Sequence, residues 1–200
     1  AERAGLGRLI VGRAERNVGP IDLEALERIS MALGVALVVD LGRDPLDDVA
    51  DAGHLAMQEL VLRVTRKAGF EVRFELPSRR GEPWRSIDVA VASEALRLAI
   101  QVECWNTIGD VGAATRSSGR KQAELGALAV ARWGTPARVG SVWVVRATSR
   151  NQALIARYPE VFAARFPGSS GAWIGTLTNG SEPPGEPGLV WSDVGATRLF

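Results

Sequence analysis

The chain has 200 residues, 46% of them hydrophobic, and a formal charge of +1 at neutral pH. This composition is typical of a globular chain that buries one good core and carries a small appendage. No apolar run approaches the roughly 20 residues that cross a bilayer, and the first residues lack the layout of a signal peptide, so we expect no membrane partner. A single cysteine and a single histidine exclude a disulfide framework, a zinc finger and a Cys/His protease, and they predict a cytoplasmic location.

The first 40 or so residues predict short helices. Helices are expected over 2–6 and 7–16, and a third begins after the N-cap Asp22 and ends at Gly34. A short extended run over 35–39 follows, and the polar break over 42–45 has the composition of a linker. We therefore predict two domains, over 1–43 and 44–200.

The sequence pattern of the second domain predicts an α/β fold. A long amphipathic helix over 46–68 precedes a strand over 70–76, a basic loop over 77–83 and two further strands, over 86–92 and 96–104. A loop over 106–112, a helix over 113–131 and a strand over 141–147 complete the order helix, three strands, helix, strand. Beyond it we expect a helix over 151–166 interrupted by Pro159, a turn over 168–171, a loop over 183–188, and a closing strand pair, 188–191 with 197–200.

Two acidic residues stand out in the central strands. Asp88 and Glu103 both lie out of phase with the apolar residues of their runs. If a turn near Glu94 joins the two strands, Asp88 faces Gln101, and Glu103 is its diagonal neighbour at about 7–8 Å. Two carboxylates at that separation are able to bind one hard cation.

Basic residues gather in three segments that could meet phosphates. They are Arg3, Arg8, Arg13 and Arg16, then Arg79, Arg80 and Arg85, and finally Arg116, Arg120 and Lys121. For any one cluster the alternative is ordinary solvated surface.

The residues over 4–17 and 22–35 resemble part of a Cro/CI-type (XRE-family) helix-turn-helix domain. The Gly5-Leu6 turn and the Ala-Leu-Gly-Val helix end at 32–35 carry the resemblance. It implies that the helix over 7–16 is a recognition helix, that Arg8, Arg13 and Arg16 contact double-stranded DNA, and that the protein is a homodimer. The alternative is a small helical cap whose arginines face water.

The residues over 46–147 resemble the PD-(D/E)XK fold of restriction endonucleases and Holliday junction resolvases, through the element order, Asp88 and Glu103. The resemblance implies a mixed-sheet αβββαβ core in which these two carboxylates bind Mg²⁺. The family lysine, two positions after the glutamate, is replaced here by Trp105. Since this lysine can be relocated to the following helix, Lys121 is its expected substitute. The resemblance further implies Glu59 and the Cys104 carbonyl as metal ligands, and Arg116 and Arg120 as DNA contacts.

The remaining candidates have simpler interpretations. We expect Trp105 to pack beneath the active-site loop, His54 to lie on a helix surface and Cys104 to be a small buried hydrophobe. Asn106 either caps the turn before the next helix or orients water or phosphate.

Together these features predict a DNA-binding protein in which part of a helix-turn-helix domain precedes a nuclease-like domain. If the domain is active, the reaction is Mg²⁺-dependent hydrolysis of DNA phosphodiesters. Two alternatives stay open. One is a non-catalytic transcription regulator whose nuclease-like domain serves dimerisation or effector binding, and the other is an antitoxin-like protein that represses its own promoter.

Overall fold

The computed structural model describes residues 1–16, 18–35, 37, 49–77 and 86–200. Its contacts divide the chain into two compact units, Ala1–Asp47 and Asp48–Phe200. Most of the extended run over 35–39, the break over 42–45 and the basic loop, with Arg79, Arg80 and Arg85, lie outside the described residues.

The first unit is helical. A single 3-10 turn, η1 (Glu2–Ala4), precedes α1 (Arg8–Arg16) and α2 (Leu23–Leu33). The Asp22 side chain caps α2 by accepting a hydrogen bond from the Ala25 N–H at 2.7 Å, and Gly34 ends the helix at φ 69°. Arg28 of α2 donates to the Gly5 carbonyl at 2.8 Å. The Asp22 cap, the end at Gly34 and, to within one residue, the helix over 7–16 are confirmed, whereas the helix expected over 2–6 is only the 3-10 turn η1.

The second unit contains a five-stranded mixed sheet in the order β1-β2-β3-β4-β5. The strands are β1 (Glu71–Pro77), β2 (Ser86–Ser93), β3 (Leu98–Trp105), β4 (Arg138–Arg146) and β5 (Gly188–Ser192). The first three are antiparallel, whereas β4 and β5 run parallel to β3. The predicted α/β class is confirmed, and the arrangement is consistent with a restriction-endonuclease-like core.

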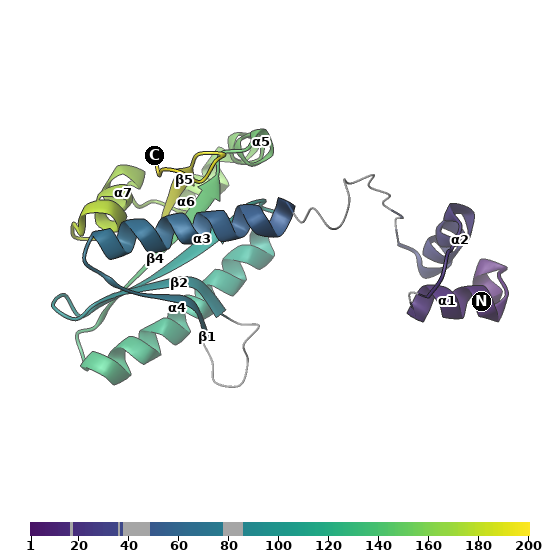
Figure 1. Ribbon diagram of the computed structural model, residues 1–200, viewed down its shortest axis with the longest axis horizontal. Coiled ribbons are helices and arrows are strands. Elements are labelled where there is room, and N and C mark those ends of the chain that lie inside the picture. The colour runs from purple at the N-terminus through teal and green to yellow at the C-terminus, as the bar shows by residue number, and fades with distance from the viewer. Residues whose placement is uncertain (17, 36, 38–48, 78–85) are drawn as a thin grey trace. The chain divides into compact units, whose positions relative to one another are not determined.

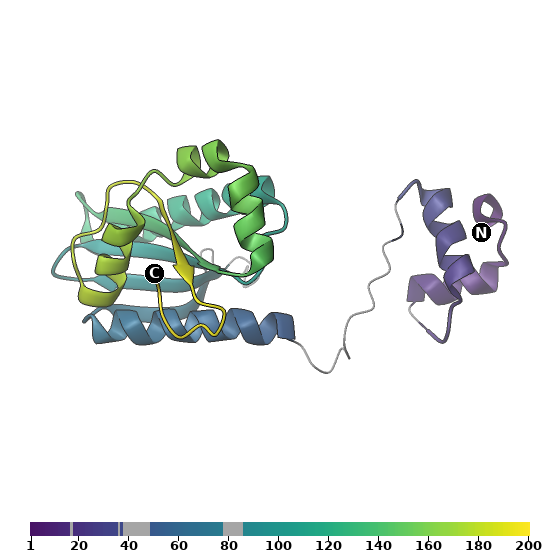
Figure 2. The same ribbon diagram turned by 90° about the horizontal axis from the view of Figure 1, so that it is seen from above.

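Helices cover both faces of this sheet (Figures 1 and 2). α3 (Val49–Lys67) and α7 (Ser170–Asn179) pack on one face, where side chains of all the strands from β2 to β5 form the largest core cluster. α4 (Val111–Trp133) packs on the other face, and α6 (Pro159–Arg165) contributes Phe162 to a further cluster there. None of the described helices is long and apolar enough to cross a membrane.

The register of β2 and β3 differs from the predicted one. Ala90, not Asp88, pairs with Gln101, and Ser93 pairs with Leu98. The predicted turn was too short, because the connection takes the four residues 94–97, with Arg97 in the left-handed region at φ 45°. Continuing the pairing by one residue puts Asp88 opposite Glu103 rather than diagonal to it, so the two carboxylates start from closer backbone positions than expected.

The pairing of β1 with β2 is interrupted opposite Asp88. Phe74 pairs with Val89 and Leu76 with Ile87, but Glu75, at φ 44°, has no partner between them. The predicted alternation of apolar residues on one face of β2 is broken at the same place. Val89 packs in the cluster under α3, whereas Ile87 packs in a cluster under α4. A local irregularity of this kind re-aims side chains at the end of a strand, and Asp88 is the residue that it affects.

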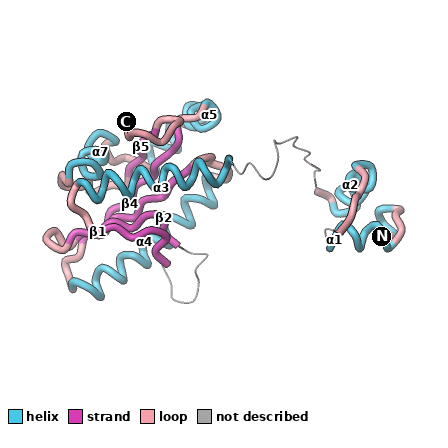
Figure 3. Tube along the Cα trace, in the orientation of Figure 1, coloured by secondary structure: helices cyan, strands magenta, loops and turns pink. Residues whose placement is uncertain are grey.

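The C-terminal region contains a helix that the sequence analysis missed. Pro159 does divide the predicted helix, into α5 (Ser149–Arg157) and α6. The turn predicted over 168–171 instead leads into α7, whose Trp173 is fully buried against β4 and β5. Gly188 of β5 permits this packing, because a Cβ atom there would overlap the Trp173 ring. The alternation of helix and strand is visible along the chain in Figure 3.

The closing strand pair is confirmed in part. Ser192 bridges antiparallel to Leu199, and Trp191 and Phe200 exchange backbone hydrogen bonds of 3.1 and 2.9 Å. However, β5 also pairs in parallel with β4, so it is an integral strand of the main sheet.

Candidate active site

A hollow of about 390 Å³ lies where β3 ends and the loop to α4 begins. Its lining residues come from α3, β2, β3, the loop and α4, and they are His54, Asp88, Glu103, Cys104, Trp105, Asn106, Thr107 and Lys121. Five segments distant in sequence therefore converge on one small volume. We call these eight residues the hollow.

Glu103 and Lys121 form a buried ion pair in the hollow. The Lys121 Nζ atom lies 2.6 Å from Glu103 Oε2, and the two side chains are only 14% and 4% exposed. The other carboxylate oxygen, Oε1, accepts a hydrogen bond from the Gln101 amide at 3.0 Å. Gln101 also donates to Ser118, which accepts from the Trp143 indole. This network fixes the orientation of the Glu103 carboxylate.

Asp88 lies in the same hollow as Glu103. Its Oδ2 atom accepts a hydrogen bond from the Cys104 backbone N–H at 2.7 Å, which ties the two strands together at this point. The same oxygen lies 3.8 Å from His54 Nε2. The hollow thus combines two carboxylates with a lysine and an imidazole.

Burial changes the titration of both carboxylates. It raises the pKa of the Asp88 carboxyl above its usual range, and the Cys104 N–H, Lys121 and His54 oppose the increase. Burial also raises the pKa of Glu103 to about 7; the Asp88 charge adds to this increase, and Lys121 and Gln101 oppose it. Two carboxylates whose charges repel each other in a partly buried site are stabilised by an added cation.

The loop that forms one wall of the hollow is held by buried hydrogen bonds. Asn151 of α5 is fully buried; its Oδ1 accepts from the Ile108 N–H at 3.1 Å, and its Nδ2 donates to the Asn106 and Arg146 carbonyls at 3.0 and 2.9 Å. Arg146 donates to Asn106 Oδ1 at 2.9 Å and to the Val194 carbonyl. The wall is therefore fixed by α5 and by the C-terminal segment.

Gly53 brings helix α3 against this wall. A Cβ atom there would lie 2.5 Å from Arg146 Nη1 and 2.8 Å from Asn106 Oδ1. Only glycine allows so close an approach, and the next residue of the helix is His54. The glycine consequently sets the position of the imidazole in the hollow.

Trp105 packs as the sequence predicts. Its ring centroid lies 4.8 Å from that of Trp143, which is itself 4.8 Å from the ring of Phe166. The ring is half-buried, and it lines the hollow as well. Cys104 is buried among apolar side chains, and burial raises the pKa of its thiol well above the usual range, so it stays a neutral hydrophobe as expected.

The donor set fits a hard divalent cation at Asp88, Glu103 and the Cys104 carbonyl. Mg²⁺ commonly takes one or two carboxylates and keeps several waters, so two buried carboxylates meet its need. Across the described ranges, no group of three or more His, Cys, Asp and Glu side chains is close enough together to hold a metal. Glu59 does not join the set. It is exposed on α3 and lines a separate depression with Leu55 and Phe74, among others.

The predicted DNA contacts do not line the hollow. Arg116 and Arg120 are exposed on α4, about half a turn around the helix from the inward-facing Ser118. Arg8, Arg13 and Arg16 are exposed on α1 in the first unit.

His54 is the residue that the sequence analysis missed. It was expected on the helix surface, but it lines the hollow beside Asp88. A signal was present in the sequence. Met57, Val61 and Thr65 are fully buried and follow at helical spacing, so His54 continues the face of α3 that meets the sheet.

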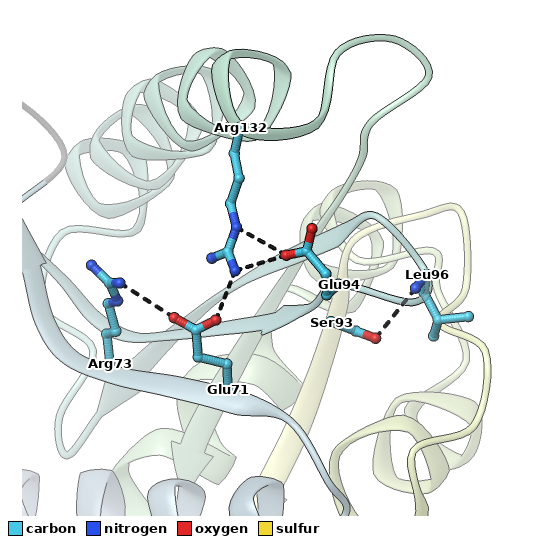
Figure 4. Close-up of polar contacts among 6 residues, drawn as sticks. All are labelled: Glu71, Arg73, Ser93, Glu94, Leu96 and Arg132. Atoms are coloured by element: carbon cyan, nitrogen blue, oxygen red, sulfur yellow. Dashed lines mark hydrogen bonds and ion pairs between the residues drawn. The ribbon is translucent and has the colours of Figure 1, made fainter.

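A second charged cluster links α4 to β1 and to the loop between β2 and β3 (Figure 4). Arg132 of α4 lies 2.9 Å from Glu71 and 2.8 Å from Glu94, and Arg73 lies 3.3 Å from Glu71. All of these side chains are more than 40% exposed. The figure also shows the Leu96 N–H donating to Ser93 in the loop that sets the β2–β3 register.

Comparisons with known proteins do not assign the chain to a family. No protein-family description matches the chain, and no curated protein matches it. Among solved structures, the chain is similar to an XisH family protein from Nostoc punctiforme, with 15% identity and a TM-score of 0.38 over 72% of this chain and 96% of that one. The functional argument therefore rests on the geometry of the hollow.

Proposed function

We propose that the second unit is a metal-dependent nuclease that hydrolyses DNA phosphodiesters in the hollow. The observation that carries the proposal is the 2.6 Å pair of Lys121 with Glu103 beside Asp88. Trp105 occupies the position at which the PD-(D/E)XK family, which the chain resembles, has its lysine. Lys121 of α4 contacts the Glu103 carboxylate instead. A nuclease of this class needs two acidic metal ligands and one cation, and these three residues meet that need.

The residues of the hollow and Gln101 have different roles in the proposed reaction. Asp88 and Glu103, with the Cys104 carbonyl, hold the metal, which when bound polarises the phosphate and lowers the pKa of water. Lys121 places a positive charge where negative charge grows on the phosphate. Gln101 is a positioning residue, because it donates to Glu103 Oε1. Since the hollow is small and partly enclosed, these charges act more strongly than they would in bulk water.

The first unit supplies affinity for double-stranded DNA in this proposal. Three exposed arginines on a nine-residue helix support contacts with phosphates. Such contacts are independent of sequence, and they keep the nucleic acid near the second unit through the linking residues.

A second candidate function is a non-catalytic DNA-binding regulator. The observation that favours it is the saturation of the acidic pair, because Gln101 and Lys121 satisfy both oxygens of Glu103 and the Cys104 N–H satisfies Asp88 Oδ2. Carboxylates that have hydrogen-bond partners without a metal are also expected in a nuclease-like domain that has lost its catalytic activity. In that case the second unit would serve dimerisation or effector binding.

A plasmid-nicking assay distinguishes the two functions. We expect the wild-type protein to nick supercoiled DNA with Mg²⁺ or Mn²⁺ but not with EDTA, and Asp88→Asn, Glu103→Gln and Lys121→Met each to abolish the activity. Arg132→Met is the matched control, since it removes a cation from the same helix in the exposed cluster, and it should keep full activity. Binding of DNA without nicking under every metal condition would establish the regulator instead.

A further inference from the structure

We infer that Trp105 is a stacking platform for an unpaired nucleobase, and that the nuclease acts on a nucleotide that is single-stranded or flipped out of a duplex. The inference rests on the proposed function and names its substrate class. The juxtaposition that carries it is a half-buried indole in the same hollow as the two carboxylates, two positions after Glu103 on β3.

The Trp105 ring is held rigidly from one side. Trp143, which is 1% exposed, lies 4.8 Å from it, and Phe166 lies 4.8 Å from Trp143 on the far side. Trp105 is half-buried and is one of the residues that line the hollow. A flat aromatic surface that is already fixed costs little conformational entropy when a ligand stacks on it.

The loop that lines the hollow next to Trp105 is fixed as well. The buried Asn151 side chain holds the loop at Asn106 and Ile108 through three hydrogen bonds, and the absence of a side chain at Gly53 lets α3 close against that loop. A slot with stiff walls suits a flat, rigid group, and a volume of about 390 Å³ lies within the range of small-ligand pockets.

The chemistry beside the ring selects a nucleotide among flat ligands. Lys121 and His54 supply cationic or donor groups for a phosphate, and the two carboxylates attract a divalent cation that would bind the same phosphate. A base that stacks on Trp105 while its phosphate reaches Glu103 must have left the base stack of a duplex, because a paired base presents only its edge. Base–aromatic stacking therefore favours unpaired substrates of any sequence.

A fluorescence titration tests this inference. The probe is a 12-nucleotide deoxyoligonucleotide with 2-aminopurine at its centre, used single-stranded and in duplex, with Ca²⁺ as the divalent ion. We expect the wild type to bind both forms, since the first unit binds duplex DNA in the proposed function, but to quench the 2-aminopurine more strongly in the single strand than in the duplex. Trp105→Leu should weaken single-strand binding by about 5- to 150-fold, since stacking contributes roughly 1–3 kcal/mol per base. Trp105→Phe, which keeps a ring, should lose less.

Trp133→Leu is the matched control, because this indole lines the separate hollow beside Arg132; its binding and quenching should equal those of the wild type. Near-ultraviolet circular dichroism checks that each variant is folded, and Trp105→Phe serves if the leucine variant unfolds. Equal quenching of the 2-aminopurine in both forms, or unchanged binding and quenching in a folded Trp105 variant, would overturn the inference. Failure of the proposed function gives a different result: the wild-type protein shows no metal-dependent nicking. That result is obtained without any Trp105 variant.

Discussion

Two charged clusters beside α4 have similar composition and different chemistry. In each, a cation of α4 is paired with acidic residues of the sheet region: Lys121 with Glu103 of β3, near Asp88 of β2, and Arg132, three turns further along, with Glu71 of β1 and Glu94 of the β2–β3 loop. In the buried cluster the pKa values of the acids are raised by burial. In the exposed cluster the hydrogen bond from Arg132 lowers the pKa of Glu71. Burial, rather than the presence of acids and a cation, makes the first cluster a candidate site.

The largest effect on stability is expected from Lys121→Met. The change removes the cation and leaves the buried Glu103 carboxylate without its ion pair, which costs about 3–5 kcal/mol of unfolding free energy. Urea unfolding in EDTA at pH 8 measures it.

The loss caused by Lys121→Met should depend on pH. The pKa of Glu103 is about 7 in the folded protein and its usual value is 4.5, so the folded state binds more protons between these values, and stability falls as the pH rises through this window. Near pH 5 Glu103 is protonated and needs no cation, so the variant should approach the wild type. A loss of equal size at pH 5 and pH 8 would contradict this assignment.

Gln101→Leu should have a smaller effect, about 1 kcal/mol, because one neutral donor to the Glu103 carboxylate is lost. Its pH dependence should have the same sign as that of Lys121→Met, since the donor stabilises the ionised form. Ser118→Ala is the matched control. It disturbs the same network at Gln101 and Trp143 without touching Glu103, so its effect should not vary between pH 5 and pH 8.

Arg132→Ala should have the smallest effect of the three. Its guanidinium and both acidic partners are exposed, and ion pairs in water are weak and screened by salt. The midpoint of urea unfolding should move much less than in Lys121→Met, and the shift should disappear in 1 M NaCl. A shift that matches that of Lys121→Met at high salt would show that burial does not separate the two clusters.

The sequence was sufficient for the core order helix, three strands, helix, strand. Lys121 was expected from the resemblance, as the substitute for the family lysine, and it contacts Glu103. The sequence was insufficient where a local backbone irregularity decides the geometry. The loop with the left-handed Arg97 shifts the β2–β3 register by two residues, and near the interruption at Glu75 the Ile87 side chain packs on the other face of the sheet from Val89. Neither Arg97 nor Glu75 is a glycine, so the residue types gave no indication of a left-handed backbone conformation at these two positions.

Tertiary packing explains the other differences. Glu59 has a suitable charge and lies on α3, but its position on the helix directs it to a different surface, whereas His54 shares the sheet-facing stripe of Met57 and Val61. Helix α7 was missed because its glycine-rich start predicts a turn, whereas the Ser169 N-cap, the Gly180 C-cap and the burial of Trp173 against β4 and β5 stabilise it as a helix.

Calorimetric titration of Mn²⁺ tests the central claim most directly, on the wild type, on the double variant Asp88→Asn, Glu103→Gln, and on the matched double variant Glu71→Gln, Glu94→Gln. The two doubles remove the same number of acidic groups, from the buried and the exposed cluster. The account predicts that the wild type and the exposed-cluster variant bind the metal equally and that the buried-cluster variant does not bind it. Absence of binding in the wild type, or binding that survives loss of Asp88 and Glu103, would contradict it.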